Sequence, residues 1–380
     1  MDVKLHLLHI VRRYGPVGGM ERYVWELTLH LHKLGHDVTV LCERCHVDKP
    51  HGIAVYELGE VAPRPRWLAA MRFDRHVRFW LETNPQKNTI IHSHERVSVH
   101  DLTTFHGSLF ATVLEKPWWK LISPRIAMQL HLERRELAVA QCIVPNSQRI
   151  KQQLAEYYPE YAHKLSRPVI PGVAVEEVRA PREVARDGGV VGFVGTEWKR
   201  KGLAQAIQAV ARLRASRPNL TFMVIGPKVE EVQHLFADWQ GGYELHPWEE
   251  HVDFSRLDVL LHPARSEPYG MNIIEAMAAG VPVVVSDACG AAPDILPEAG
   301  KILPTDACAE EWAAALDEQL SRSEPVPQFE RGWSEVAREY ALILRTRCML
   351  TAPETAEARM PGIDADTFEN EQGISGWHPG

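Results

Sequence analysis

The sequence predicts an α/β protein with two doubly wound, Rossmann-like domains. Short apolar runs alternate with amphipathic segments along the chain, which is the pattern of β-α-β units. A glycine-containing turn follows the first apolar run of each half, at residues 15–19 and again at Gly195. The length of 380 residues is also sufficient for two domains of ordinary size.

The first half opens with a predicted strand over residues 3–11, followed by a helix from about Glu21 to Leu34. Val24, Leu27 and Leu31 recur at helical spacing and give this helix a buried face. The remaining predicted elements of this half are strands over 37–42, 89–92, 102–105 and 142–144, a helix over 124–140, and a helix capped by Asn146 or Ser147.

In the second half, Val259–Leu261 is a short apolar run typical of a strand buried on both faces. A break at Gly270 separates it from a predicted helix over 272–279, which Gly280 ends. The other expected elements are strands over 190–194, 220–225, 243–246 and 281–285, and helices over 310–320 and 329–344.

We therefore expect five regions along the chain. They are an N-terminal domain over 1–172, a linker over 173–188, a C-terminal domain over 189–328, a last helix over 329–348 and a disordered tail over 349–380. The tail is rich in proline, glycine and acidic residues and lacks apolar periodicity.

Composition indicates a soluble globular protein, with 45% hydrophobic and 24% charged residues. No apolar run approaches the length of a transmembrane helix, and the N-terminus reads as a strand rather than a signal peptide, so we expect a cytoplasmic protein. Residues 1–172 carry 23 Lys and Arg against 17 Asp and Glu, whereas residues 173–380 carry 19 against 33. The basic first half suggests an anionic ligand, and no nucleic-acid-binding module accompanies the charge.

Two carboxylates flank the start of the helix over 272–279. Glu267 lies in the loop before it and Glu275 lies within it, while Gly270, Met271 and Asn272 place free backbone N–H groups between them. A helix N-terminus favours an anion such as phosphate, and carboxylates bind hydroxyls. A nucleotide-sugar carries both kinds of group, and it is the expected ligand.

This stretch, Glu-x7-Glu followed by Ala-Met-Ala-x-Gly-x-Pro-Val-Val, resembles the signature of the retaining, two-domain glycosyltransferases of the family-4 type. The resemblance implies the GT-B fold, in which two Rossmann-like domains face each other across a cleft and a C-terminal helix crosses back to the first domain. It also implies that Glu267 contacts the hydroxyls of the donor sugar and Glu275 the ribose.

Three further segments are similar to the same family. Gly18-Gly19-Met20-Glu21 resembles its GG-x-E loop, whose amides approach the donor diphosphate or the acceptor. His106 matches a strand-end histidine that faces the transferred sugar. Lys201 falls on the family's phosphate-binding lysine, but Thr196 replaces a common arginine, so Arg200 is the expected second cation.

Arginine and aromatic residues alternate in two segments of the first half. They include Arg64, Arg66, Trp67, Arg72 and Arg75, with Trp118 and Trp119 further along. This composition suits an acceptor-binding surface or peripheral contact with an anionic leaflet, on the inner face of the cytoplasmic membrane. The alternative is an amphipathic helix that uses its aromatic residues in the domain core.

No metal or other cofactor is expected. Cys42 and Cys45 have C-x-x-C spacing, which permits a metal or redox site, but no second pair follows, and plain thiols are the preferred interpretation. His92, His94 and Glu95 lie at a strand end, where substrate contacts or local hydrogen bonds are preferred to a metal.

The sequence thus predicts a hexosyltransferase that moves a sugar from a nucleotide-sugar, with a UDP-sugar favoured, to a glycan or glycolipid acceptor such as lipopolysaccharide core. One alternative is a transferase with a soluble acceptor. The other is a non-catalytic glycan- or membrane-binding protein on a transferase fold.

Overall fold

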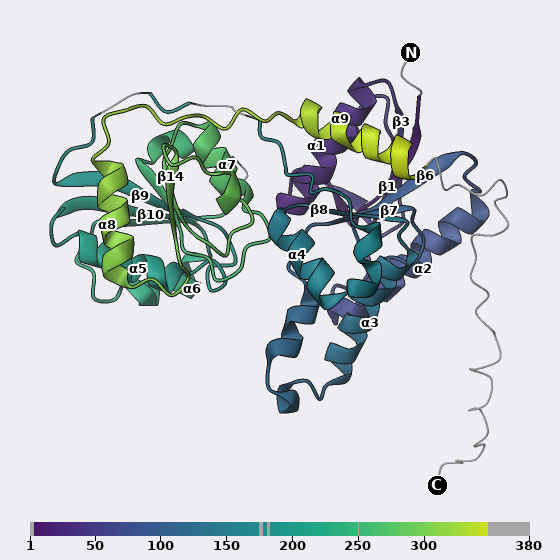
Figure 1. The fold of residues 1–380 in the computed structure, drawn as a ribbon, viewed down its shortest axis with the longest axis horizontal. Helices are drawn as coiled ribbons and strands as arrows, with labels where there is room; N and C mark the ends of the chain where they lie inside the picture. Colours follow the sequence, from purple (N-terminus) through teal and green to yellow (C-terminus); the bar gives the residue numbers. More distant parts are fainter. Residues whose placement is uncertain (1–3, 175–177, 181–182, 250, 349–380) are drawn as a thin grey trace, which may run out of the picture.

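The computed structural model describes residues 4–174, 178–180, 183–249 and 251–348, which form two α/β domains side by side (Figure 1). The predicted tail over 349–380 lies outside the described residues, as does part of the predicted linker. Among the described residues, the structure has no helix that is long and apolar enough to cross a membrane.

The N-terminal domain is built on a parallel six-stranded sheet of order β5-β3-β1-β6-β7-β8. Its strands are β1 (His6–Ile10), β3 (Asp37–Cys42), β5 (Ala54–Glu57), β6 (Thr89–Ser93), β7 (Leu102–Phe105) and β8 (Cys142–Pro145). The central strand β1 pairs Leu8 with Thr39 of β3 on one side and with Ile91 of β6 on the other. A short pair of strands, β2 (Arg13–Tyr14) and β4 (Arg44–Cys45), extends beyond this sheet.

Helices cover both faces of this sheet. They are α1 (Gly19–Lys33), α2 (Arg66–Thr83), α3 (Pro124–Val139) and α4 (Gln148–Tyr157), with short helices η1 (Phe110–Glu115), η2 (Trp118–Lys120) and η3 (Pro159–Lys164). Helix α1 packs Val24, Leu27 and Leu31 into one core cluster, while α2 packs Phe73 and Val77 into another. Helix α1 begins two residues earlier than predicted, because Gly18 is its N-cap.

The C-terminal domain repeats the same topology, with strand order β11-β10-β9-β12-β13-β14. Its strands are β9 (Gly188–Val194), β10 (Asn219–Gly226), β11 (Tyr243–Pro247), β12 (Val259–His262), β13 (Val283–Ser286) and β14 (Gly300–Leu303). Its helices are α5 (Leu203–Leu213), α6 (Val229–Val232), α7 (Met271–Ala278) and α8 (Ala309–Leu320), with short helices η4 (Gln233–Phe236), η5 (Phe254–Arg256) and η6 (Ala292–Asp294).

The last described helix returns to the first domain. Helix α9 (Trp333–Ile343), continued by η7 (Leu344–Cys348), crosses from the second domain and packs beside α1 (Figure 1). The hydroxyl of Tyr340 lies 2.9 Å from that of Tyr23, and the Trp333 ring meets the Tyr23 ring edge-on at 5.1 Å. The predicted fold class, with two Rossmann-like domains and a crossover helix, is confirmed.

In each sheet, the carboxyl ends of the central strands lie together at one edge. In the N-terminal domain, the carboxyl ends of β1, β6 and β7 are neighbours and lead to Arg12, His94 and His106. In the C-terminal domain, β9 and β12 are neighbours and lead to the loops that carry Lys201 and Glu267. Open parallel sheets bind ligands at these edges, so the topology already locates both halves of a site.

Candidate active site

Glu267 is the centre of a buried cluster in the C-terminal domain. It lies in the loop between β12 and α7 and is only 7% exposed. Its Oε2 atom lies 3.1 Å from Nη1 of Arg200 and 3.5 Å from Nζ of Lys201. The structure thus brings together three residues that the sequence placed in one site, from the loops after β9 and β12.

The electrostatics of the cluster keep Glu267 ionised. Burial alone raises the pKa of this carboxyl, but Lys201, His262 and Arg200 outweigh burial and hold the pKa well below its usual range. Arg200 is fixed further by the Glu197 carboxylate at 2.6 Å and by the Ser266 carbonyl at 2.5 Å. The site therefore presents two oriented cations around one carboxylate.

His262, which the sequence analysis did not single out, supports Glu267 from behind. It is fully buried at the end of β12, and its Nε2 lies 3.3 Å from Oε2 of Glu267. The amide of Asn272 lies 3.1 Å from Nδ1 of His262 and donates to the Val194 carbonyl at 2.9 Å. Burial lowers the pKa of His262 to about 4, so the ring is neutral and donates from Nε2 to Glu267.

The start of α7 lies beside this cluster. Gly270 is the N-cap and has φ +108°, a left-handed conformation that favours glycine. Met271 is partly buried and packs against core clusters of both domains. The side chain of Asn272 faces inward, so only its backbone is available for the predicted phosphate contact.

Glu275 lies in α7 and faces the other domain. Its carboxylate is 3.3 Å from Nη1 of Arg22 in α1, and both side chains are partly exposed. The side chain predicted to bind the ribose, that of Glu275, therefore also contacts the opposite domain.

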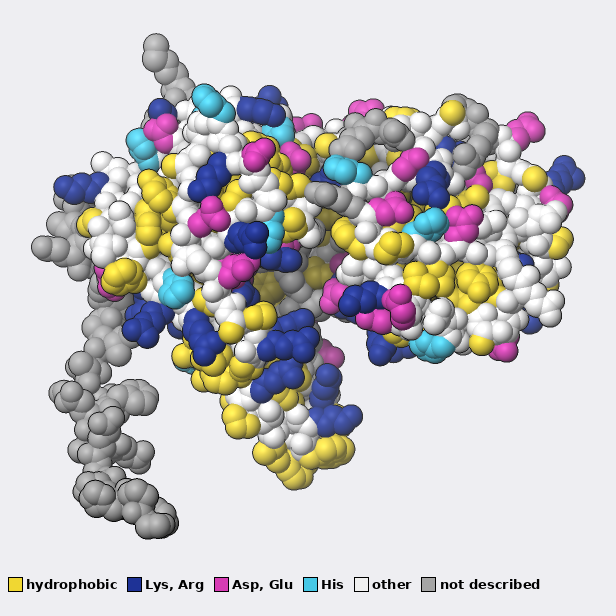
Figure 2. Space-filling model, turned by 180° about the vertical axis from the view of Figure 1, so that it is seen from behind, with side chains coloured by type: hydrophobic (Ala, Val, Ile, Leu, Met, Phe, Trp, Pro, Cys, Tyr) yellow, Lys and Arg dark blue, Asp and Glu magenta, His cyan; other side chains and the backbone are white. Residues whose placement is uncertain are grey.

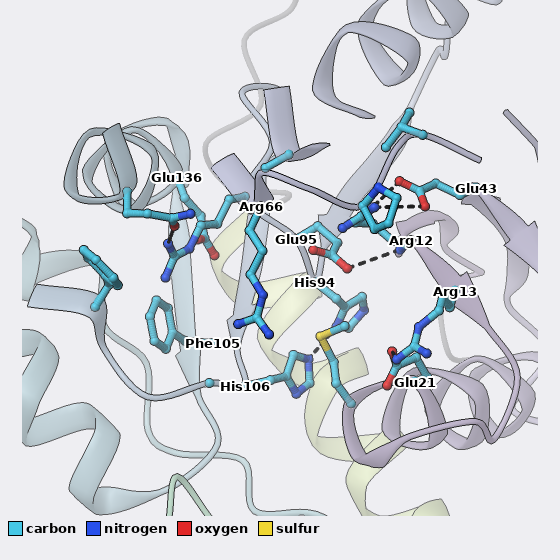
Figure 3. A pocket seen from close by; sticks show the side chains of 18 of the residues that line it. Arg12, Arg13, Glu21, Glu43, Arg66, His94, Glu95, Phe105, His106 and Glu136 are labelled. Atoms are coloured by element: carbon cyan, nitrogen blue, oxygen red, sulfur yellow. Dashed lines mark hydrogen bonds and ion pairs between the residues drawn. The ribbon is translucent and has the colours of Figure 1, made fainter. Parts of the chain in front are cut away.

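The N-terminal domain has a cavity of about 830 Å³ at the carboxyl edge of its sheet (Figure 3). Its lining includes six arginines, namely Arg12, Arg13, Arg44, Arg66, Arg96 and Arg125. Four of these are paired with carboxylates, as Arg12 is with Glu43 at 2.6 Å. Arg66 and Arg125 form no ion pair with any described residue, and Figure 3 shows Arg66 pointing into the cavity.

His106 lines this cavity directly after β7. Its ring meets the Tyr23 ring edge-on at 4.7 Å, and its carbonyl accepts a hydrogen bond from the Asn146 amide at 3.1 Å. The next residue, Ser147, caps α4 and donates from Oγ to the Pro268 carbonyl at 2.7 Å. Two consecutive residues therefore connect the His106 segment to the loop that carries Glu267.

The predicted glycine turn adjoins the same cavity. A side chain at Gly18 would meet the Glu21 carboxylate at 2.4 Å, whereas the space beside Gly19 is open. Glu21 lines the cavity and pairs with Arg13 (Figure 3). Gly19 is therefore exposed with open space beside it, whereas any side chain at the partly exposed Gly18 would displace the Glu21 carboxylate.

The predicted acceptor surface is divided between exposed and packed residues. Arg64, Arg72 and Arg75 are exposed and Trp67 is partly buried.

Trp118 and Trp119 are 69% and 61% exposed, with Leu114 and Ile122 beside them. Figure 2 shows hydrophobic side chains at the tip of a projection from the N-terminal domain, with Lys and Arg above them. The core alternative holds for Phe73, which is 1% exposed.

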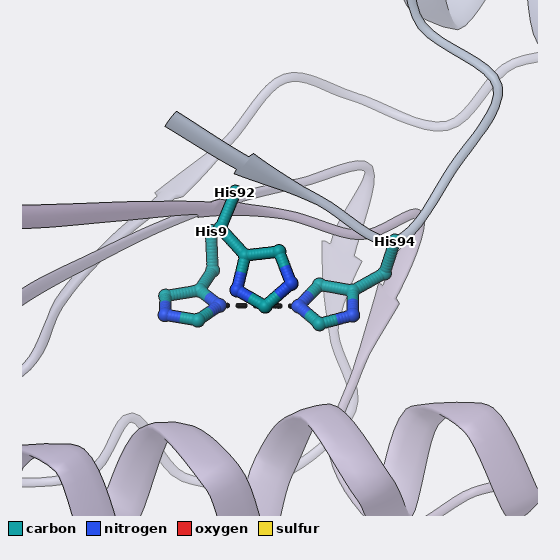
Figure 4. Close-up of side chains that lie close together, drawn as sticks. All are labelled: His9, His92 and His94. Carbon is teal, nitrogen blue, oxygen red and sulfur yellow. Dashed lines mark hydrogen bonds between the residues drawn. The ribbon is translucent and has the colours of Figure 1, made fainter. Parts of the chain in front are cut away.

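Two groups of metal-ligating residue types occur in the first domain. His9, His92 and His94 lie close together and are buried (Figure 4), with donor atoms within 4.8 Å of one another. Cys42 is buried, which raises the pKa of its thiol to about 12. The thiol of Cys42 donates to the Tyr56 carbonyl and the thiol of Cys45 donates to the Val47 carbonyl, so the two thiols form separate local hydrogen bonds.

Two facing Rossmann-like domains, a helix that crosses back and a site with carboxylates and cations at the cleft define a GT-B glycosyltransferase fold. A family model described as Glycosyltransferase Family 4 matches residues 17–176, and one described as Glycosyl transferases group 1 matches residues 188–322. Together these models account for most of the chain, which belongs to this glycosyltransferase family.

Among curated proteins, the chain is 31% identical to the lipopolysaccharide glucosyltransferase WaaG of Escherichia coli over 170 residues, which cover 43% of this chain. The match spans 44% of the length of that relative, less than half of it.

Solved structures show the same fold over a longer range. A structure of WaaG matches with a TM-score of 0.71 and 19% identity, covering 91% of this chain and all of that one. Anabaena HepE in complex with UDP-glucose matches with a TM-score of 0.65 and 15% identity, covering 90% and 100%.

Proposed function

We propose that the protein transfers a hexose from a nucleotide-sugar to a phosphorylated glycan or glycolipid acceptor, with retention of configuration. The observation that carries this proposal is the buried Glu267 with Arg200 and Lys201 around it. These residues lie at the carboxyl edge of the sheet, where open parallel sheets bind ligands. An ionised carboxylate suits sugar hydroxyls, and the two cations suit a diphosphate.

The proposed chemistry uses fixed charge. As the bond between the sugar C1 and the diphosphate oxygen breaks, negative charge grows on the leaving group, where Arg200 and Lys201 stabilise it. Fixed groups of this kind each contribute roughly 10²–10³ in rate. These two cations supply the positive charge that a diphosphate needs, so no metal is required in this proposal.

We infer a front-face route to the retained product. The acceptor oxygen bonds to C1 on the side from which the diphosphate leaves, and the acceptor proton passes to the departing phosphate oxygen. Neither Glu267, held by two cations, nor another residue of the site is assigned as a covalent nucleophile. NMR of the product tests this route, because an inverted anomeric configuration rejects it.

Donor binding is the first test of the proposal. Calorimetry with UDP-, GDP- and ADP-sugars, without added metal, is expected to show binding of one nucleotide class, with UDP favoured because HepE was solved with UDP-glucose. Glu275→Ala should weaken this binding roughly 10- to 100-fold, whereas Glu298→Ala, at an exposed carboxylate of the same domain, should leave it unchanged. Absence of binding by every donor contradicts the proposal and favours a non-catalytic glycan-binding protein.

The acceptor is proposed from the cavity of the first domain. Its size of about 830 Å³ admits a glycan segment, and Arg66 and Arg125, which form no ion pair with the residues that the structure describes, favour a phosphate group. The similarity to WaaG suggests lipopolysaccharide core as the acceptor class.

We also propose that the exposed tip of the first domain contacts an anionic membrane from the cytoplasmic side. Trp118, Trp119 and Ile122 are each more than half exposed, and Lys116 and Lys120 stand among them. Tryptophan with lysine is the composition that peripheral proteins place at a headgroup region. A lipid-linked acceptor would then be presented near the cavity.

A further inference from the structure

Three histidines form a continuous hydrogen-bonded row behind the candidate site. Nδ1 of His9 lies 3.1 Å from Nε2 of His94, and Nδ1 of His94 lies 2.8 Å from Nε2 of His106 (Figures 3 and 4). The three come from β1 and from the ends of β6 and β7, which are neighbours in the sheet. The row therefore leads from the domain interior to the cavity.

The geometry of the rings identifies these contacts as in-plane hydrogen bonds. The ring centres of His9 and His94 are 5.4 Å apart with planes at 12°, and those of His94 and His106 are 5.1 Å apart with planes at 34°. In both pairs the distance between the ring centres exceeds the N···N distance by about twice the distance from a ring centre to a ring nitrogen. The two nitrogens therefore lie on the line that joins the ring centres. A shared metal ion would instead require the lone pairs of His9 and His94 to point to a third position.

Each ring in the row carries a single proton. Burial lowers the pKa of His9 and of His106 to about 3, and it lowers the pKa of His94 well below its usual range. A neutral imidazole has one N–H and one lone pair. His94 therefore donates through one nitrogen and accepts through the other, and the whole row has a single direction.

The buried end of the row sets this direction. Nε2 of His9 is buried and has no hydrogen-bond partner among the described residues. If the donors pointed toward His9, this atom would carry a buried N–H without an acceptor, which proteins avoid more strictly than an unpaired lone pair. If the donors point toward His106, Nε2 of His9 carries no proton, and the proton of His106 resides on Nδ1.

We propose that His9 and His94 are positioning residues that hold His106 in the tautomer protonated at Nδ1, so that it donates a hydrogen bond to a sugar hydroxyl in the cavity. This inference rests on the proposed function, which places the transferred sugar against His106. Without the row, the proton of His106 would be distributed between its two nitrogens, and only part of the population could donate in the required direction.

Nitrogen NMR tests the tautomer without any substrate. The full chain, labelled with ¹⁵N at histidine, is measured by long-range ¹H–¹⁵N correlation, and the His106 signals are assigned by comparison with His106→Gln. We expect a protonated Nδ1 and a bare Nε2 on His106 in the wild type. In His94→Leu the proton should move toward Nε2, and His94→Gln, whose amide both donates and accepts, should restore the original state.

Kinetics provide the second readout. His94→Leu should lower kcat about tenfold, as expected for one lost oriented hydrogen bond, with KM for the donor changed less than about twofold. His94→Gln should recover most of this loss. His9→Leu replaces the far end of the row and is the second test if His94→Leu does not fold.

His92 offers a matched control. Its ring lies 4.1 Å from that of His94, but its Nε2 bonds to Thr104 Oγ1 at 2.8 Å and it is outside the row. His92→Leu should leave His106 protonated at Nδ1. A His106 protonated at Nε2 in the wild type, or a tautomer unchanged by His94→Leu, overturns the inference. Failure of every donor to react would contradict the proposed function, while the NMR result would still decide the tautomer.

Discussion

Nη1 of Arg22 lies 3.3 Å from the carboxylate of Glu275, and these residues belong to different domains. Because both side chains are partly exposed, the pair itself contributes little to stability, on the order of 0–1 kcal/mol. Its importance lies in where it places Glu275, since the carboxylate predicted to bind the ribose is already oriented by the opposite domain.

Substitution of the two partners should therefore have unequal effects on donor binding. Glu275→Ala removes a charged acceptor for two ribose hydroxyls and should weaken donor binding roughly 10- to 100-fold. Arg22→Ala should change it less than about threefold, as measured by calorimetry. Equal losses in the two variants would show that the pair, rather than a ribose contact, determines affinity.

Glu267→Gln should lower kcat by about 10²–10³, because the donor loses its ionised partner and the two cations lose their orientation. The folded-state pKa of Glu267 is depressed, so its contribution to stability is complete above the unfolded pKa of about 4.3 and is lost as pH falls toward the folded pKa. The free energy of unfolding should thus differ between wild type and variant most at pH 7, and this difference should shrink progressively as pH falls below about 4.3. Urea unfolding at a series of pH values across this range measures the change, and a difference independent of pH contradicts the assignment.

Buried histidines should make the protein sensitive to mild acid. Burial lowers the pKa of His9 to about 3 and those of His100 and His262 to about 4, and it also depresses the pKa values of His92 and His94.

These groups bind protons in the unfolded chain below about pH 6.5 but not in the native protein. Stability should therefore fall as pH decreases from 6.5 toward 4, by at most about 1.4 kcal/mol per histidine for each pH unit. Urea titrations at pH 7, 6 and 5 measure the slope, and equal stability at all three is the contrary result.

Arg66→Gln should raise KM for a phosphorylated acceptor about tenfold, because Arg66 points into the cavity and has no carboxylate partner among the described residues. Arg72→Gln is the matched control, since Arg72 is exposed on the same helix and does not line the cavity. The difference between the two variants should disappear with a dephosphorylated acceptor. A persistent difference would assign Arg66 to a sugar hydroxyl instead.

Replacement of Trp118 and Trp119 by alanine should weaken binding to anionic vesicles at least about tenfold, because each exposed indole offers a large apolar surface to the bilayer interface. Trp248→Ala removes an aromatic residue that is 49% exposed in the other domain and should leave vesicle binding unchanged. Co-sedimentation at low salt is the measurement. Wild-type protein that stays in the supernatant contradicts the membrane proposal.

Sequence alone was sufficient for the fold and for the proximity of Lys201 and Glu267. Regular alternation of strands and helices predicts parallel sheets, and both residues follow strands whose carboxyl ends share one edge. Their roles toward a donor stay predictions. His262 was missed because a lone histidine at the end of an apolar strand resembles a core residue, although its place five residues before Glu267 was a usable signal.

Other contacts had no local signal. Arg22 and Glu275 are 253 residues apart in sequence, and no periodicity connects them. The prediction for Asn272 concerned its backbone N–H group, and no local pattern indicated that its side chain would bond to the Val194 carbonyl and lie 3.1 Å from Nδ1 of His262. The row of His9, His94 and His106 depends on strand order, which the sequence does not state explicitly.

Helix α9 has a consequence for synthesis of the chain. The core of the first domain includes residues from this helix, among them Trp333, Val336 and Tyr340, which contact side chains near the start of the sequence. During translation, the ribosome releases the whole first domain long before these residues exist, although domains generally fold in order of synthesis. The nascent first domain therefore keeps an uncovered apolar face beside α1 until the residues of α9 have been synthesised.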